Sequence, residues 1–82
     1  MDTQMVYIVD DTLIKETPRA IGLPVCRRGE SHPVSTVWFP KSYAVIERRR
    51  LHRMKVSIPG WLVAKKRETG ELLKGFDILV TH

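Results

Sequence analysis

Proline and glycine divide this 82-residue chain into short apolar segments, and this division limits what it can fold into. Five prolines and five glycines interrupt the sequence, and the longest apolar runs between breaks have four or five residues. A membrane-spanning helix needs roughly 20 apolar residues, so these runs are too short for one. With 43% hydrophobic and 28% charged residues, the composition is that of an ordinary folded protein. We expect one small domain, residues 1–82.

Segments rich in β-branched and aromatic residues predict a mostly β fold of the α+β class. Strands are expected at residues 5–9, 19–26, 34–39, 43–48, 54–58 and 76–80, with a further extended stretch at 13–16. Gly22 and Pro24 indicate an irregular or edge strand at 19–26. Helix remains an alternative for 43–48, which contains Ala, Glu and Arg. We therefore expect five to six short strands in a small curved antiparallel sheet or a partly open barrel.

One short helix is predicted near residues 59–68. Pro59 suits the first helical position, where its missing N–H would have no partner in any case. The basic triplet 65–67 would occupy the last turn, where positive charge interacts favourably with the free carbonyls of the helix end. Gly70 is a natural stop.

Positive charge is concentrated in the middle of the sequence. The chain carries a formal net charge of +5, but residues 41–67 hold nine Lys and Arg against one acidic residue, Glu47. A local excess of this size favours a polyanion or an acidic protein surface as the partner. The simpler alternative is that these side chains only keep a small domain soluble.

The strongest functional feature is an arginine-rich turn between the strands expected at 43–48 and 54–58. Arginine offers planar, bidentate donors that suit phosphate and carboxylate oxygens. Aromatic side chains precede the turn, and basic groups beside exposed rings are typical of single-stranded nucleic-acid sites. Tyr43 and Trp38 are the candidates for stacking on bases, whereas Phe39 and Trp61 are expected in the core. The predicted phosphate or partner contacts are Arg48, Arg49, Arg50, Arg53 and Lys55. A second basic cluster, Lys65, Lys66 and Arg67, either enlarges this patch or only complements the carbonyl end of the helix.

Groupings that would indicate an enzyme or a metal site are lacking in the sequence. Asp10 and Asp11 are adjacent, so on a strand they would point to opposite faces. The three histidines are scattered, and with a single cysteine no zinc motif is formed. Cys26 cannot form an intrachain disulfide, which favours a cytoplasmic, intracellular protein. We predict no catalytic residues, no metal and no cofactor.

Two stretches resemble a pattern found in small, largely uncharacterised proteins of phages and mobile elements. Residues 37–42 read VWFPKS, and residues 56–66 read VSIPGWLVAKK. In the group that they resemble, a strand of the form W-[IFL]-P-K-S precedes a segment of the form I-P-x-W-L-x-x-K. The charged stretch 15–21 resembles the strand that lies upstream in those proteins. The resemblance implies a phage or mobile-element accessory protein, and it assigns no functional residues.

These observations lead to two main hypotheses of function. The first is a non-enzymatic protein that binds nucleic acid, single-stranded rather than duplex, through the arginine-rich turn. The alternative is a phage-encoded inhibitor, of the anti-CRISPR kind, that docks its basic face on an acidic or nucleic-acid-binding host protein. A structural protein that self-associates through an edge strand is a third possibility. The oligomeric state stays open, and no membrane contact is expected.

Overall fold

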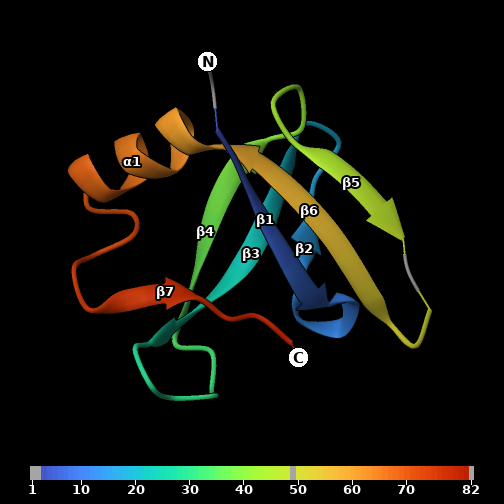
Figure 1. Ribbon diagram of the computed structural model, residues 1–82, viewed down its shortest axis with the longest axis horizontal. Coiled ribbons are helices and arrows are strands. Elements are labelled where there is room, and N and C mark those ends of the chain that lie inside the picture. Colours follow the sequence, from blue (N-terminus) through green and yellow to red (C-terminus); the bar gives the residue numbers. More distant parts are fainter. Residues whose placement is uncertain (1–2, 49, 82) are drawn as a thin grey trace.

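The computed structural model describes residues 3–48 and 50–81 of the chain (Figure 1). Its elements, in order, are β1 (Gln4–Asp10), the 3-10 helix η1 (Asp11–Leu13), β2 (Lys15–Glu16), β3 (Ala20–Arg27), β4 (Ser35–Pro40), β5 (Val45–Arg48), β6 (Arg53–Pro59), α1 (Gly60–Glu68) and β7 (Phe76–Ile78). Every strand pairing is antiparallel. The predicted class, mostly β with one helix, is confirmed. The described residues form seven strands rather than five or six, because the extended stretch 13–16 contributes β2.

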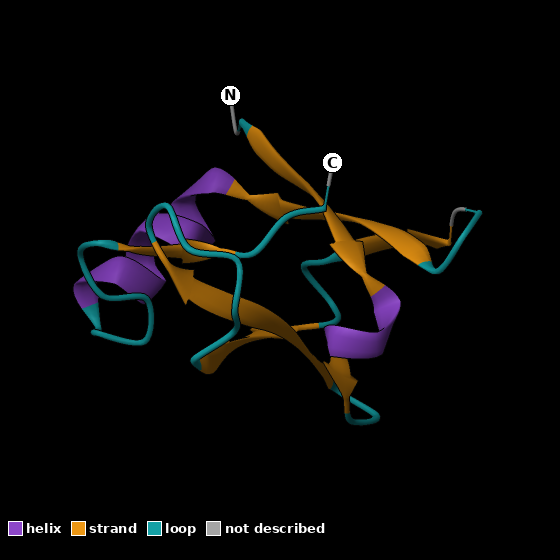
Figure 2. Cartoon of the chain, turned by 90° about the horizontal axis from the view of Figure 1, so that it is seen from below, coloured by secondary structure: helices purple, strands orange, loops and turns teal. Residues whose placement is uncertain are grey.

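The strands form two separate sheets rather than one curved sheet. The first sheet has the order β1-β6-β5. In the second, β3 lies at the centre with β4 along one edge and β2 and β7 along the other. The two sheets face each other across the core, as the edge-on view in Figure 2 shows. Among the described residues no strand pairing joins the sheets into a closed barrel.

Side-chain alternation on the strands builds the core. Met54, Val56 and Ile58 of β6 are at most 2% exposed, while the residues between them are half-buried. Val37 and Phe39 of β4 are fully buried from the opposite sheet, as their alternation predicts. Leu62 and Val63 of α1 and Leu72 beyond it close one end of the core. Cys26 is also buried, as expected of a lone cysteine beside an apolar run.

The prediction of an edge strand at residues 19–26 is wrong, because β3 is the central strand of its sheet. Pro24 is tolerated there because it lies between the residues of β3 that pair with β2 and those that pair with β7. A residue's N–H and C=O point to the same side of an antiparallel strand. The Pro24 carbonyl accepts from the Leu79 amide (2.8 Å), so its missing N–H falls in the gap between these two partners.

The remaining elements differ from the predictions mainly at their ends. The stretch 43–48 is a strand, not a helix, and it begins at Val45, with Tyr43 in the preceding turn. Pro59 is the extended residue just before α1 rather than its first helical residue. The last strand ends at Ile78 instead of residue 80, although the Thr81 amide still donates to the Ile8 carbonyl (2.7 Å).

Candidate binding surfaces

The arginine-rich turn projects from the body of the protein at the end of the β5–β6 hairpin (Figures 1 and 2). Leu51 and His52 form the centre of this turn with φ values of 60° and 59°, and the Arg53 amide donates to the Arg50 carbonyl (3.4 Å). Positive φ at both central positions is what a type I′ hairpin turn requires. The Leu51 side chain at the tip is 83% exposed.

We define the arginine tip as Arg48, Arg50 and Arg53, the predicted contacts that the structure describes here; Arg49 lies outside the described residues. Arg48 and Arg50 are exposed, and Arg53 is half-buried. The side chains of Arg48 and Arg50 have no ion pair or hydrogen bond with any described residue. Two guanidinium groups at a projecting corner are therefore available to an anionic partner.

Acidic residues lie at the base of the arginine tip, on the side of Arg53. β1 runs beside β6, which brings Asp10 opposite Arg53 and lets the Asp11 amide donate to the His52 carbonyl (2.7 Å). The Asp11 carboxylate is 3.6 Å from His52 Nδ1, an ion pair when that histidine is protonated. Hydrogen bonds from the Thr12 hydroxyl and amide lower the pKa of Asp10 and keep it ionised. The acidic N-terminal strand thus pairs with the basic turn within one chain.

Lys55 was predicted to join the arginines, but it lies farther along β6. Its ammonium is 3.8 Å from the Glu47 carboxylate of the neighbouring β5. The pair lies on the exposed face of the first sheet and offsets one positive charge there. Lys55 thus borders the arginine tip without adding an unpaired cation to it.

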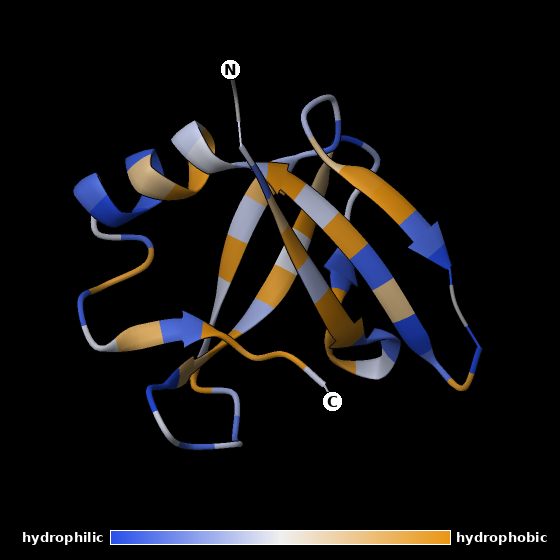
Figure 3. Ribbon diagram, in the orientation of Figure 1, coloured by the Kyte–Doolittle hydropathy of each residue, from blue (hydrophilic) through white to orange (hydrophobic). Residues whose placement is uncertain are grey.

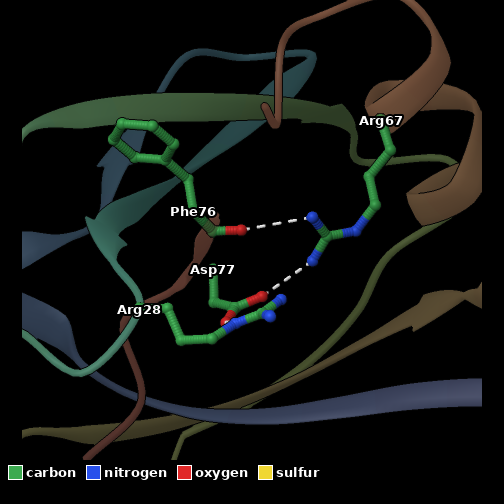
Figure 4. Close-up of polar contacts among 4 residues, drawn as sticks. All are labelled: Arg28, Arg67, Phe76 and Asp77. Atoms are coloured by element: carbon green, nitrogen blue, oxygen red, sulfur yellow. Dashed lines mark hydrogen bonds and ion pairs between the residues drawn. The ribbon is translucent and has the colours of Figure 1, made fainter. Parts of the chain in front are cut away.

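The basic end of α1 is largely neutralised by the residues that follow it. Lys66 Nζ donates to Glu71 (2.8 Å), and this hydrogen bond lowers the pKa of Glu71. Arg67 donates to the Asp77 carboxylate (2.7 Å) and to the Phe76 carbonyl (3.2 Å), as Figure 4 shows. Arg28 reaches the other oxygen of Asp77 (3.1 Å). These contacts connect α1 to the loop that follows it and to β7.

The helix triplet does not extend the arginine tip, contrary to one of the two readings of the sequence. α1 and the tip lie at opposite ends of the protein, and both hydrophilic ends are visible in Figure 3. β6 connects them, and seven extended residues span roughly 20 Å. Local charge complementarity at the helix end accounts for Lys66 and Arg67, whereas Lys65 is exposed and has no acidic partner among the described residues.

The aromatic candidates are not beside the arginines. Trp38 lies over the second sheet, where its ring would be 3.1–3.2 Å from a Cβ placed on Gly22. Tyr43, half exposed as expected, contacts Trp61 edge to face with ring centroids 5.3 Å apart. The prediction of Trp61 in the core is wrong: it is 45% exposed, because Leu62 and Val63 take the buried side of α1.

The two rings border a surface groove of about 290 Å³, which we call the aromatic groove. Lys65 and Lys66 of α1, with Thr69 and Glu71 just beyond it, line the other side of the groove, and Pro40 and Leu62 add apolar surface. Three predicted contacts, Tyr43, Lys65 and Lys66, thus meet at this groove. Trp61 is the member that sequence reasoning missed, because the ring was expected in the core and the sequence does not show which side of the short helix is buried.

The described part of the chain has a further groove, but no cluster of metal ligands and no helix that could span a membrane. No group of three or more His, Cys, Asp or Glu is close enough to hold a metal ion there. No described helix combines the length and apolar character needed to cross a membrane. A second groove of about 340 Å³ lies over Pro24 and Thr36 on the second sheet, and its lining has only Lys15 as a charged group.

Comparison of the chain with protein-family models, with curated proteins and with solved structures found no match.

Proposed function

We propose that this protein is a non-enzymatic nucleic-acid-binding protein that contacts phosphates through the arginine tip. The observation that carries the proposal is the contrast between the two basic ends. Arg48 and Arg50 are exposed on a projecting turn without acidic partners among the described residues, whereas Lys66 and Arg67 are held in ion pairs. Unpaired guanidinium groups release the counterions of the phosphates they neutralise, which makes binding favourable and salt-dependent. The resemblance to phage and mobile-element proteins supports a role in such an element.

The test is fluorescence anisotropy with labelled single-stranded DNA, single-stranded RNA and duplex DNA at roughly 50 and 200 mM salt. Affinity should fall steeply with salt, by about 0.7 to 0.9 log units per log unit of salt for each phosphate neutralised. Arg48→Ala with Arg50→Ala should lower that slope by about 1.4 to 1.8. The matched control removes two exposed lysines elsewhere, Lys15→Ala with Lys74→Ala, and should change the slope much less.

A second candidate is an inhibitor that docks on a host defence protein through the same tip. Leu51 favours it, because an apolar side chain that is 83% exposed at the tip contributes nothing to phosphate contacts but suits a protein interface. If none of the three nucleic acids binds at low salt, the first proposal is wrong. The tip is then tested by capture of host proteins with the wild type and with Leu51→Ala.

A further inference from the structure

The aromatic groove has features that phosphate contacts at the arginine tip do not require. Tyr43 and Trp61 are 50% and 45% exposed, yet their mutual contact at an interplanar angle of 85° holds both rings in place. An edge-to-face contact covers at most one face of one ring, and both residues keep about half of their surface exposed, so part of the ring surface is accessible to a ligand. Trp61 lies in the first turn of α1, and Tyr43 lies in the turn after β4, where its amide donates to the Pro40 carbonyl (3.1 Å).

Charge at the groove selects the kind of ligand. The only acid in its lining, Glu71, is already hydrogen-bonded to Lys66 Nζ (2.8 Å) and to the Thr69 hydroxyl (3.2 Å). Lys65 lines the same groove and has no acidic partner among the described residues. Exposed aromatic surface beside an unpaired ammonium group suits a ligand that is both flat and anionic. A nucleotide has this combination, because its base stacks on aromatic rings and its phosphate pairs with a cation.

We infer that the aromatic groove is a stacking site for an unpaired base of single-stranded nucleic acid, with Lys65 contacting the adjoining phosphate. Single strands are required because bases in a duplex are stacked on one another and expose only their edges. The inference deepens the proposed function and rests on it, since both need a nucleic-acid ligand. It adds a discrimination that the arginine tip alone does not provide, namely single strand over duplex.

The first sheet supplies the path between the groove and the tip. β5 is an edge strand that starts just after Tyr43 and ends at Arg48, so one nucleic-acid strand can follow it from ring to guanidinium. The six residues from Tyr43 to Arg48 span at most about 20 Å. At about 3.4 Å per stacked nucleotide, this distance corresponds to at most about six nucleotides. A trinucleotide therefore reaches only one site, whereas a 12-mer reaches both.

The direct test is NMR of the ¹⁵N-labelled protein, which has two indole N–H signals, from Trp38 and Trp61. Trp61→Phe identifies the Trp61 signal by its loss. Addition of trithymidylate should shift the Trp61 signal and leave the Trp38 signal in place, since that ring packs over Gly22. A Trp61 signal that trithymidylate leaves unmoved, or that moves only with a decaproline peptide, would overturn the inference.

Anisotropy with labelled 12-mers separates the groove from the tip. Trp61→Leu removes the ring but keeps an apolar side chain, and it should weaken binding of dT12 by about 5- to 150-fold, the range for one stacked base. The salt slope should be unchanged, duplex binding should be unaffected, and Trp61→Phe should retain most of the affinity. Leu73→Ala, at another half-exposed apolar residue, is the control.

Failure of the groove and failure of the tip give different results. If Trp61→Leu binds dT12 like the wild type while Arg48→Ala with Arg50→Ala loses it, the groove inference is wrong and the proposed function stands. If the tip variant binds with an unchanged slope while Trp61→Leu is weakened, the groove stands and the tip is not the phosphate site. If dT12 does not bind at all, both are wrong.

Discussion

Gly22 shows how a single missing side chain shapes the second sheet. A Cβ at this position would lie 2.7 Å from the Thr36 Cγ2 atom and 3.1 Å from the Trp38 ring. Thr36 is β-branched and sits within β4, so its methyl group has little freedom to move. We expect Gly22→Ala to destabilise the protein by about 1–3 kcal/mol through overpacking. Thermal unfolding should then show a Tm lower by about 4–8 °C for each kcal/mol.

The neighbouring threonine provides the control for this prediction. Thr36→Ser removes the methyl group that the new Cβ would meet, so it should recover part of the stability lost in Gly22→Ala. Recovery should be incomplete, because the Trp38 contacts remain. Equal Tm values for Gly22→Ala with and without Thr36→Ser would mean that the steric explanation is wrong.

The tip turn places two ordinary residues in a backbone conformation that asparagine and glycine prefer. Leu51 and His52 both have φ near +60°, where a residue with a Cβ is strained by roughly 1–2 kcal/mol. Leu51→Asn with His52→Gly should relieve part of this strain and raise the free energy of unfolding by about 1 kcal/mol, measured by urea denaturation. The alanine pair at the same positions keeps the strain and should show no such gain. A larger gain with alanine would point to the apolar Leu51 side chain instead.

At the level of elements, alternation in the sequence identified the strands well, and local rules failed where tertiary contacts override them. The buried and exposed positions of β4 and the buried positions of β6 follow the period-two pattern. Gly22 and Pro24 together indicate an irregular or edge strand, but the missing N–H of Pro24 falls between two partner strands that the sequence does not reveal. Such gaps depend on strand order, which is a long-range property.

The candidate site was predictable only in the part that lies within one segment of the sequence. The arginines of the tip could be named, because a basic run between two strands has to form their turn. The partner of Tyr43 could not, since the contact with Trp61 joins the loop after β4 to the start of α1. Nor does the sequence show that Glu71 and Asp77 neutralise the helix end. Both are contacts between elements rather than properties of a segment.

Asp77 of β7 binds Arg67 of α1 and Arg28 of the turn after β3, and it should make stability depend on pH in the acid range. Hydrogen bonds from Arg67 and then Arg28 lower the pKa of Asp77 below its ordinary value of 3.8 in the folded protein. The unfolded chain therefore binds a proton first as pH falls, so this stabilisation is full above pH 3.8 and is lost as pH falls through the lowered pKa. In urea titrations, Asp77→Asn should be less stable than the wild type at pH 7. The free energies of unfolding of the two proteins should converge as the pH falls below 3.8. A difference that stays constant with pH would contradict this linkage.

On the scale of the whole molecule, the fold redistributes a charge that is contiguous in sequence. Residues 41–67 hold nine basic side chains, but β6 separates those at the tip from those on α1. Acidic partners offset the charge of several of them. Since the Debye length is about 8 Å at physiological salt, the two ends act on a ligand almost independently. Under the proposed function, affinity for nucleic acid should therefore depend on where cations remain unpaired, and only weakly on the net charge of +5.

A variant with restored net charge tests this directly. Arg48→Ala and Arg50→Ala remove two positive charges, and Glu30→Gln with Glu68→Gln removes two exposed negative charges elsewhere, so the fourfold variant again has a formal net charge of +5. If location decides, its salt slope for labelled dT12 should match that of the double arginine variant rather than the wild type. The glutamine pair alone should bind at least as well as the wild type. Long-range attraction depends on total charge, whereas phosphate contacts depend on individual guanidinium groups. Wild-type binding by the fourfold variant would therefore show that overall charge controls affinity and that the tip is not a defined site.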